Sequence, residues 1–235
     1  MNLSDAFAGA LRLLLQADAD LWQIIFVSLR TSFTALLIAT PIALVLAYQI
    51  GASHFAGRRI VIWLLQTSLS IPTVLIGLLL YSVLSRNGVL GGWHWLFSAN
   101  ALVLGQTLIA LPVLMAFVMT AVQSADPRLA ETALTLGASR WQVMLTVMSE
   151  LRFAVVAALI HGFGRVISEV GCAMMVGGNI AGDTRTMTTA IALETSKGEF
   201  AQGIALGLVL LLIALVLNAV LLLVQGKAGH AESKR

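Results

Sequence analysis

Three ionisable side chains recur at every fourth position within an apolar stretch of the sequence. His161, Arg165 and Glu169 therefore share one face if this stretch is helical. An ionised group inside a bilayer is costly, so such residues are candidates for function. Arg165 and Glu169 could line the path of a solute, or they could neutralise each other where two helices meet. The lone His161 is interpreted as an interior histidine whose hydrogen bonds are satisfied.

Small and hydroxylated residues surround this charged face. Small side chains, which let membrane helices approach closely, occupy Gly164, Ser168, Gly171 and Cys172. Beyond them, residues 177–189 are rich in Gly, Thr and Asn. Irregular backbone at membrane depth is tolerated where it lines a cavity. We therefore interpret residues 177–200 as a gate, in which Asn179, Thr186 and Thr188 could donate hydrogen bonds to a solute. An ordinary connecting loop is the alternative.

The sequence lacks the motifs of several catalytic and nucleotide-binding sites. It holds no His-Glu-x-x-His, no Gly-x-Ser-x-Gly and no close pair of aspartates in its apolar stretches, which argues against an intramembrane enzyme. It also lacks the Gly-x-x-x-x-Gly-Lys-Ser/Thr phosphate loop, so it cannot bind a nucleotide in that way. Because Cys172 is the single cysteine, an intrachain disulfide and paired-cysteine metal sites are excluded. We expect no metal and no cofactor in this chain.

The composition is that of a membrane protein. Hydrophobic residues make up 59% of the chain and charged residues 11%, and the mean hydropathy is +0.94. The net charge of +3 comes from basic residues scattered singly between apolar blocks, without the basic stripe of a nucleic-acid-binding protein. We therefore predict an all-α integral membrane protein with a single domain, and no nucleic-acid partner.

Five apolar blocks are long enough to span a bilayer, since a hydrocarbon core about 30 Å thick requires roughly 20 apolar residues in a helix. The fourth block exceeds one crossing, so we expect its first part, with Glu150 and Arg152, to lie at the membrane interface. Pro41, Pro72 and Pro112 fall within blocks, where they would kink the helices. The predicted core of residues 24–224 comprises the blocks 24–50, 60–84, 101–122, 143–176 and 203–224.

The basic residues predict an orientation, because cytoplasmic connections carry an excess of Lys and Arg. We place the N-terminus outside and the C-terminus in the cytoplasm. Residues 1–20 are acidic, and we expect the first span to act as an uncleaved signal. The cytoplasmic set of basic residues comprises Arg58, Arg59, Arg128, Arg140, Arg152, Lys227, Lys234 and Arg235. The smaller outer set comprises Arg12, Arg86, Arg185 and Lys197.

A short amphipathic helix with both ends specified is predicted between the third and fourth spans, on the cytoplasmic side. Asp126 can cap this helix, and Pro127 suits its first position. Gly137 can adopt the left-handed conformation that ends a helix. Ala133 lies on its apolar face and Glu131 on its polar face. Such a helix could lie passively on the membrane or bind a partner.

This helix resembles the EAA loop of ABC-importer permeases, where Glu-Ala-Ala is followed after three residues by Gly. Here Glu131-Thr132-Ala133 is followed after three residues by Gly137, and residues 147–150 replace the downstream Ile-x-Leu-Pro of that family. The resemblance implies that the helix, over residues 126–138, couples the chain to ATP-binding subunits. The residues expected at that contact are Asp126, Pro127, Glu131, Ala133, Gly137, Ala138, Arg140 and Trp141.

A second match resembles the tungstate branch of the tungstate, molybdate and sulfate permeases. It comprises residues 164–171, 174–180 and 184–191, whereas molybdate permeases carry a related but different pattern. The resemblance to the permease domain as a whole covers roughly residues 25–225. It implies a type I ABC-importer permease, a multi-pass protein of the cell inner membrane that imports tungstate by alternating access.

The same resemblance implies partners and a path. We expect a homodimer of this chain within membrane lipid, two ATP-binding cassette subunits, and an extracytoplasmic binding protein that delivers the anion. The residues expected along the path and its gate are Arg165, Ser168, Glu169, Gly171, Asn179, Thr186 and Thr188. A molybdate or sulfate permease is the nearest alternative. An ATPase-independent secondary transporter or channel is more distant, because five helices cannot form two equal inverted repeats.

Overall fold

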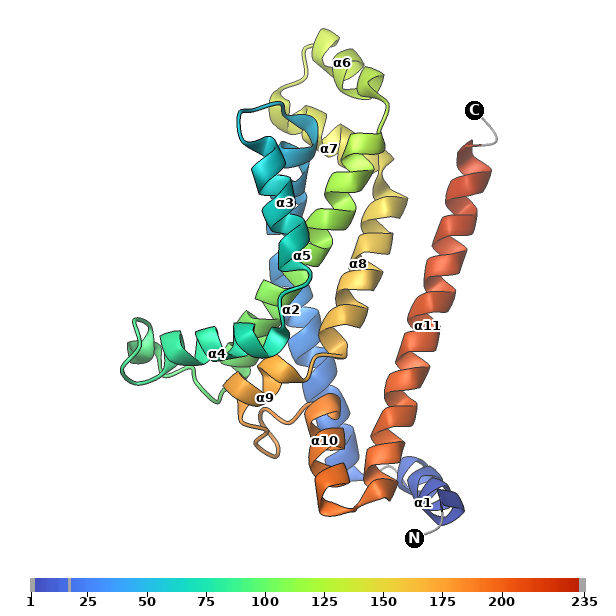
Figure 1. The fold of residues 1–235 in the computed structure, drawn as a ribbon. Coiled ribbons are helices and arrows are strands. Elements are labelled where there is room, and N and C mark those ends of the chain that lie inside the picture. The colour runs from blue at the N-terminus through green and yellow to red at the C-terminus, as the bar shows by residue number, and fades with distance from the viewer. Residues whose placement is uncertain (1–2, 17, 233–235) are drawn as a thin grey trace.

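The computed structural model describes residues 3–16 and 18–232, and every regular element within them is a helix. The predicted all-α class is therefore confirmed. In chain order, the elements are α1 (Leu3–Leu15), α2 (Ala19–Ala52), α3 (Arg58–Ser68), α4 (Thr73–Leu84), the 3-10 turn η1 (Gly91–Trp93), α5 (Ala99–Ser124), α6 (Pro127–Thr135), α7 (Arg140–Glu150), α8 (Arg152–Ile167), α9 (Gly171–Gly177), α10 (Met187–Lys197) and α11 (Phe200–Glu232). The bundle is elongated: α1 and α10 lie at one end, and α6 and the C-terminal end of α11 lie at the other (Figure 1).

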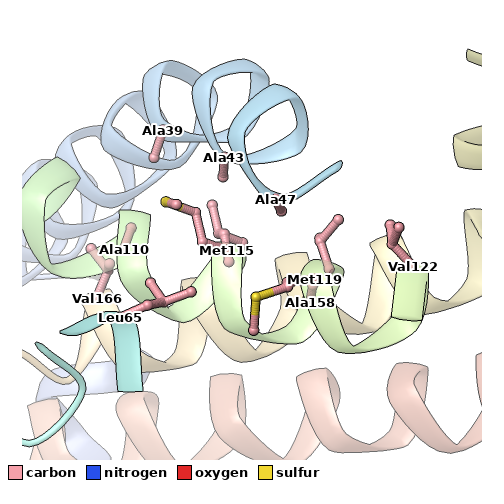
Figure 2. Packing of buried hydrophobic residues seen from close by; sticks show 12 residues of the cluster. Ala39, Ala43, Ala47, Leu65, Ala110, Met115, Met119, Val122, Ala158 and Val166 are labelled. Carbon is pink, nitrogen blue, oxygen red and sulfur yellow. The ribbon is translucent and has the colours of Figure 1, made fainter. Parts of the chain in front are cut away.

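The centre of the bundle is a close contact between α2 and α5. Alanines recur at every fourth position of α2, and Ala39, Ala43 and Ala47 are fully buried. They face α5, where Met115 and Met119 fill the space between the helices (Figure 2). Lipid provides no hydrophobic drive for helix association, so small side chains that let two backbones approach favour this contact.

Three helices are each long and apolar enough to cross a membrane: α2, α5 and the Phe200–Val224 part of α11. Two further crossings result if each bent helix pair is counted as one span. These pairs are α3 with α4, bent by 98°, and α7 with α8, bent by 76°. The block 60–84 is thus bent at the proline expected to kink it, the block 143–176 holds more than one helix, and α4 projects sideways from the bundle (Figure 1).

Proline explains the first of these breaks. Residues 69–72 separate α3 from α4, and Pro72 precedes the first residue of α4. Pro72 has no N–H to donate, and its ring disfavours helical geometry at Ile71. By contrast, Pro41 and Pro112 remain inside α2 and α5, as predicted.

The fourth apolar block is broken twice. Leu151 ends α7 and precedes α8, so the bend separates Glu150 from the apolar part of the block. Three residues, 168–170, then separate α8 from α9. The bend at Leu151 sets the first part of this block apart, and the place of that part at the membrane interface stays a prediction; the second break was not anticipated.

The N-terminal region holds a helix that the sequence interpretation did not include. Helix α1 packs against α11, and Ala10 is fully buried there. Helix α2 then begins at Ala19 and not at residue 24, because the Asp18 carboxylate accepts a hydrogen bond from the Leu21 N–H at 3.0 Å. An acidic N-cap of this kind satisfies a backbone donor that the helix leaves unpaired.

Candidate functional site

Arg165 and Glu169 form an ion pair, with 3.0 Å between Nη1 and Oε2. The Glu169 side chain is 2% exposed and the Arg165 side chain 39%. The other carboxylate oxygen of Glu169 accepts the Cys172 N–H at 2.9 Å, in the first turn of α9. The Glu169 carbonyl accepts the Thr188 hydroxyl at 2.6 Å. Glu169 therefore links α8, α9 and α10, and its buried charge is fully hydrogen-bonded.

Arg165 lies where two broken helices meet. It borders a small cavity together with Ser68, Leu69 and Thr73, at the break between α3 and α4, and with Pro112 of α5. One guanidinium N–H binds Glu169, and the half-exposed remainder of the group stays accessible. Of the two charged residues, Arg165 is thus the one that could meet a solute.

His161 is not an interior residue in the single chain, so that interpretation is corrected. It is exposed on α8, and its ring stacks on Phe117 of α5 with centroids 4.7 Å apart and planes 9° apart. Phe117 is itself 45% exposed. The imidazole thus packs flat against a neighbouring exposed ring and is not buried.

The small residues beside the charged face divide into two groups. A Cβ on Gly171 would lie 2.6 Å from Val74 of α4, and a Cβ on Gly105 of α5 would lie 2.6 Å from the Cys172 sulfur. These contacts confirm close packing around Gly171 and Cys172. A Cβ on Gly164 would meet no atom of the described chain within 4 Å, and Ser168 is exposed, so this half of the face packs against no helix of the described chain.

The segment after α9 is an ordered turn followed by a helix, so the irregular part is shorter than predicted. Gly178 and Asn179 both have positive φ, 68° and 52°. The Thr184 hydroxyl donates to the Gly177 carbonyl and accepts the Ile180 N–H. Helix α10 then starts at Met187. The turn is closed by its own hydrogen bonds.

The threonines of this segment use their hydroxyls within the protein. Thr186 and Thr188 are 3% and 7% exposed, and their hydroxyl oxygens lie 3.1 Å apart. Thr186 caps α10 through a reciprocal pair of hydrogen bonds with Thr189. The Asn179 amide donates to the Thr189 carbonyl at 3.4 Å, while its buried Oδ1 lacks a partner within the described chain.

Helix α6 has the ends that the sequence predicts. The Asp126 carboxylate accepts the Arg128 N–H at 2.9 Å, Pro127 occupies the first turn, and Gly137 has φ 82°. The next corner is closed by a capping box between Ser139 and Gln142, which starts α7 at Arg140. In the described chain no residue of α6 is buried, so the whole helix is presented at the tip of the bundle (Figure 1).

The apolar side of this tip is also exposed. Leu134, Leu136 and Trp141 are 53%, 83% and 59% exposed. Below α6, a cavity of about 670 Å³ separates Asp126 and Glu131 from the ends of α2 and α3. An exposed rod with apolar residues and fixed ends is suited to binding another protein.

Two functional features escaped the sequence interpretation. Arg58 was treated only as a topological charge, yet it donates to the Ile50 carbonyl at 2.8 Å and the Gly51 carbonyl at 3.1 Å, which secures the end of α2 beside α6. Arg30 was not considered, although a basic residue inside an apolar block was a visible signal. It lines a separate cavity.

Comparisons with known proteins agree with this architecture. The family described as binding-protein-dependent transport system inner membrane component matches residues 39–228. The tungstate uptake system permease protein TupB of Campylobacter jejuni is 42% identical over 91% of this chain and 90% of its own. TupB of Peptoclostridium acidaminophilum is 36% identical over 93% of this chain and 96% of its own. The molybdenum permease ModB of Haemophilus influenzae is 30% identical over 81% of this chain and 89% of its own.

A solved structure has the same fold. It is that of a bacterial ABC transporter involved in the import of the acidic polysaccharide alginate. The TM-score is 0.71 at 19% identity, over 95% of this chain and 83% of the other. The extended family match, the high identity to two permeases and this fold lead to one assignment: the chain belongs to the family of binding-protein-dependent transport system inner membrane components.

Proposed function

We propose that this chain is the membrane subunit of an ABC importer that takes up tungstate by alternating access, with ATP hydrolysed on a separate subunit. The observation that carries the proposal is the similarity to two tungstate permeases, at 42% and 36% identity over more than nine-tenths of this chain. Identity falls to 30% for a molybdenum permease and 27% for a sulfate permease. Tungstate is therefore favoured over these two alternatives.

Helix α6 is the proposed contact with the ATP-binding cassette subunits. Its support is an exposed rod with apolar side chains and two stabilised corners, which can pass a displacement to α5 and α7 without bending. The proposed contact residues are Asp126, Pro127, Glu131, Ala133, Gly137, Ala138, Arg140 and Trp141. In this arrangement the α6 end of the bundle faces the cytoplasm, each bent pair counts as one crossing, and the five crossings leave the N-terminus outside.

The proposed path runs along the exposed side of α8. Arg165 would face the anion, since its side chain is 39% exposed and an oxyanion accepts hydrogen bonds from a guanidinium. Glu169 would hold Arg165 in place and close the first turn of α9. Ser168 and Gly171 flank this pair at the break between α8 and α9.

The outer gate is assigned to residues 177–200. Asn179, Thr186 and Thr188 stabilise its closed form through hydrogen bonds inside the protein. When the gate opens, these bonds would exchange for bonds to the anion. The exposed faces of α8 and α5 would meet a second copy in a homodimer, and the end with α10 would receive an extracytoplasmic binding protein.

Selective uptake tests the proposal. The chain would first be tagged in its native membrane, and the ATP-binding subunit that copurifies with it would be identified. Both subunits would then be expressed with the binding protein in cells that lack tungstate and molybdate uptake. Tungsten accumulation would be measured by mass spectrometry. We expect that excess sulfate does not suppress this accumulation and that molybdate suppresses it less than unlabelled tungstate does. Equal accumulation with a catalytically inactive ATPase subunit would favour a secondary transporter or channel.

A further inference from the structure

A cavity of about 340 Å³ lies between α2 and the first turns of α5, and none of its lining residues belongs to the gate or to the cavity beside Arg165. Its volume is within the range of roughly 300–1,000 Å³ that is usual for small-ligand sites. Ten residues line it, and Arg30 of α2 is the one charged residue among them. The cavity therefore has a positive charge and no carboxylate in its wall.

Arg30 has no charged partner in the part of the chain that the structure describes. Two ion pairs occur there, Arg165 with Glu169 and Lys197 with Glu194, and Arg30 belongs to neither. Arg30 lies inside an apolar spanning helix, where an ionised residue is normally paired or placed on a solute pathway. Arg30 is exposed on α2, so a negative group that pairs with it would come from a ligand or another molecule.

The free hydrogen-bond donors in the cavity come from three side chains, Arg30, Asn100 and Trp95. Three threonine hydroxyls there donate to backbone carbonyls of their own helices: Thr31 at 3.0 Å, Thr34 at 2.7 Å and Thr107 at 2.7 Å. Their hydrogens are thus already used. The side chains of Arg30, Asn100 and Trp95 have no hydrogen-bond partner among the described residues, and all three line the cavity. The Arg30 charge disfavours a cation here, whereas an anion would find a guanidinium, an amide and an indole N–H.

We propose that this cavity binds a tetrahedral oxyanion group, with the planar guanidinium of Arg30 contacting two oxygens and Asn100 orienting the group. Bidentate, charge-assisted hydrogen bonds of this kind are characteristic of arginine. The adjacent first turn of α5 adds the positive end of its helix dipole. Tungstate and the phosphate of an anionic lipid present the same chemistry, and the choice of tungstate as the free anion rests on the proposed function.

Direct binding tests the site. The full chain, purified in detergent, would be titrated with sodium tungstate by calorimetry, and native mass spectrometry would count bound phosphatidylglycerol. The variants are Arg30→Gln, Arg30→Lys and Asn100→Asp, with Arg86→Gln in an exposed loop as the control. We expect Arg30→Gln to weaken binding roughly 10- to 100-fold, the range for charge-assisted hydrogen bonds, and Arg30→Lys to weaken it less. Arg86→Gln should bind as the wild type does.

Two outcomes support the site and differ in the source of the oxyanion. Loss of tungstate binding in Arg30→Gln identifies the free anion, and loss of bound phosphatidylglycerol alone identifies the lipid. If Arg30→Gln does not fold, Asn100→Asp gives the answer, because a carboxylate in the cavity should abolish anion binding while supplying Arg30 with a partner.

Other outcomes overturn the site. The site is refuted if Arg30→Gln or Asn100→Asp binds tungstate and phosphatidylglycerol as the wild type does. It is also refuted if the wild-type chain binds neither ligand. If the wild-type complex imports tungstate while the variants bind both ligands unchanged, only the site fails. If the wild type does not import tungstate, the proposed function fails, and the lipid measurement still judges the site.

Discussion

The Ser28 hydroxyl of α2 accepts a hydrogen bond from the Met187 N–H of α10 at 2.6 Å, across 159 residues of sequence. Ser28 is 2% exposed, and its own hydrogen goes to the Ile24 carbonyl at 3.0 Å. Met187 is the first residue of α10, where the helix itself provides no acceptor for the N–H. One buried hydroxyl thus attaches the proposed gate to α2.

Replacing Ser28 by Ala should loosen the start of α10. The buried Met187 N–H would lose its acceptor, which costs about 1–3 kcal/mol. Hydrogen exchange at residues 187–189 should become faster, and the thermal transition in detergent should fall. Ser196→Ala is the control, since that exposed hydroxyl bonds only within its own helix, to Leu193. Unchanged exchange in Ser28→Ala would contradict the attachment.

The Arg165 and Glu169 variants should differ from each other. Arg165→Gln strands a carboxylate that is 2% exposed, and removing one partner of a buried pair costs roughly 3–5 kcal/mol. Glu169→Gln leaves a guanidinium that is 39% exposed and can be hydrated, so its folded yield should be higher. The double variant should recover the folded yield.

Anion uptake by the double variant separates the two roles of this pair. Because Arg165 is assigned to the path, uptake by the double variant should stay reduced about tenfold or more although this variant folds. A tenfold reduction corresponds to about 1.4 kcal/mol. Folded yield by size-exclusion chromatography and tungsten uptake would be measured on the same samples. Wild-type uptake by the double variant would assign the pair to structure alone.

Gly105 and Cys172 should be energetically coupled. A Cβ at Gly105 would lie 2.6 Å from the Cys172 sulfur, and overpacking of this kind costs about 1–3 kcal/mol. Gly105→Ala should therefore lower the thermal transition, and adding Cys172→Ala should restore much of it. Gly207→Ala in α11 should have little effect, because its Cβ would meet no described atom within 4 Å. Additive effects of the first two substitutions would rule out the contact.

The left-handed turn after α6 should be needed for coupling. Gly137 has φ 82° and open space around it, so Gly137→Val acts through backbone strain of roughly 1–2 kcal/mol and not through a clash. Uptake and copurification of the ATPase should fall. Gly57 offers a matched control, with φ 88° and no described atom within 4 Å, but outside α6. If Gly57→Val and Gly137→Val impair uptake equally, the coupling role of α6 is not supported.

Labelling of single cysteines tests the orientation. In a Cys172→Ala background, an impermeant thiol reagent added outside should modify cysteines placed at Ser85 or Ser196 and spare those at Ser53 or Ser139. The first two lie at the α4 and α10 ends and the last two beside α3 and α6. The reverse pattern would put α6 outside the cell and remove its access to ATP.

Local sequence signals predicted some elements well. Asp126, Pro127 and Gly137 define α6 because capping depends on residues close in the chain. Hydropathy located α2, α5 and α11, since apolar runs of this length indicate helices that span a membrane. Hydropathy carries no direction, however, so it could not reveal that α4 turns by 98° from α3 within a single apolar block.

The site was harder to predict, because exposure and hydrogen-bond partners are set by distant segments. The spacing of Arg165 and Glu169 correctly predicted a shared face, but not that Glu169 alone is buried. Thr188 looked like a free donor until its partner, the Glu169 carbonyl 19 residues away, was known. Periodicity also could not show that His161 is exposed.

ATP-dependent transport by the purified complex tests the central claim most directly. The chain, its copurifying ATPase subunit and the binding protein would be reconstituted in liposomes, and tungstate entering the lumen would be measured with and without ATP. We expect that tungstate accumulation requires ATP and all three components. Gly137→Val should abolish this accumulation, and Gly57→Val should not. Tungstate entry at the same rate without ATP, or with the ATPase subunit omitted, would contradict the assignment of this chain as an ABC-importer permease.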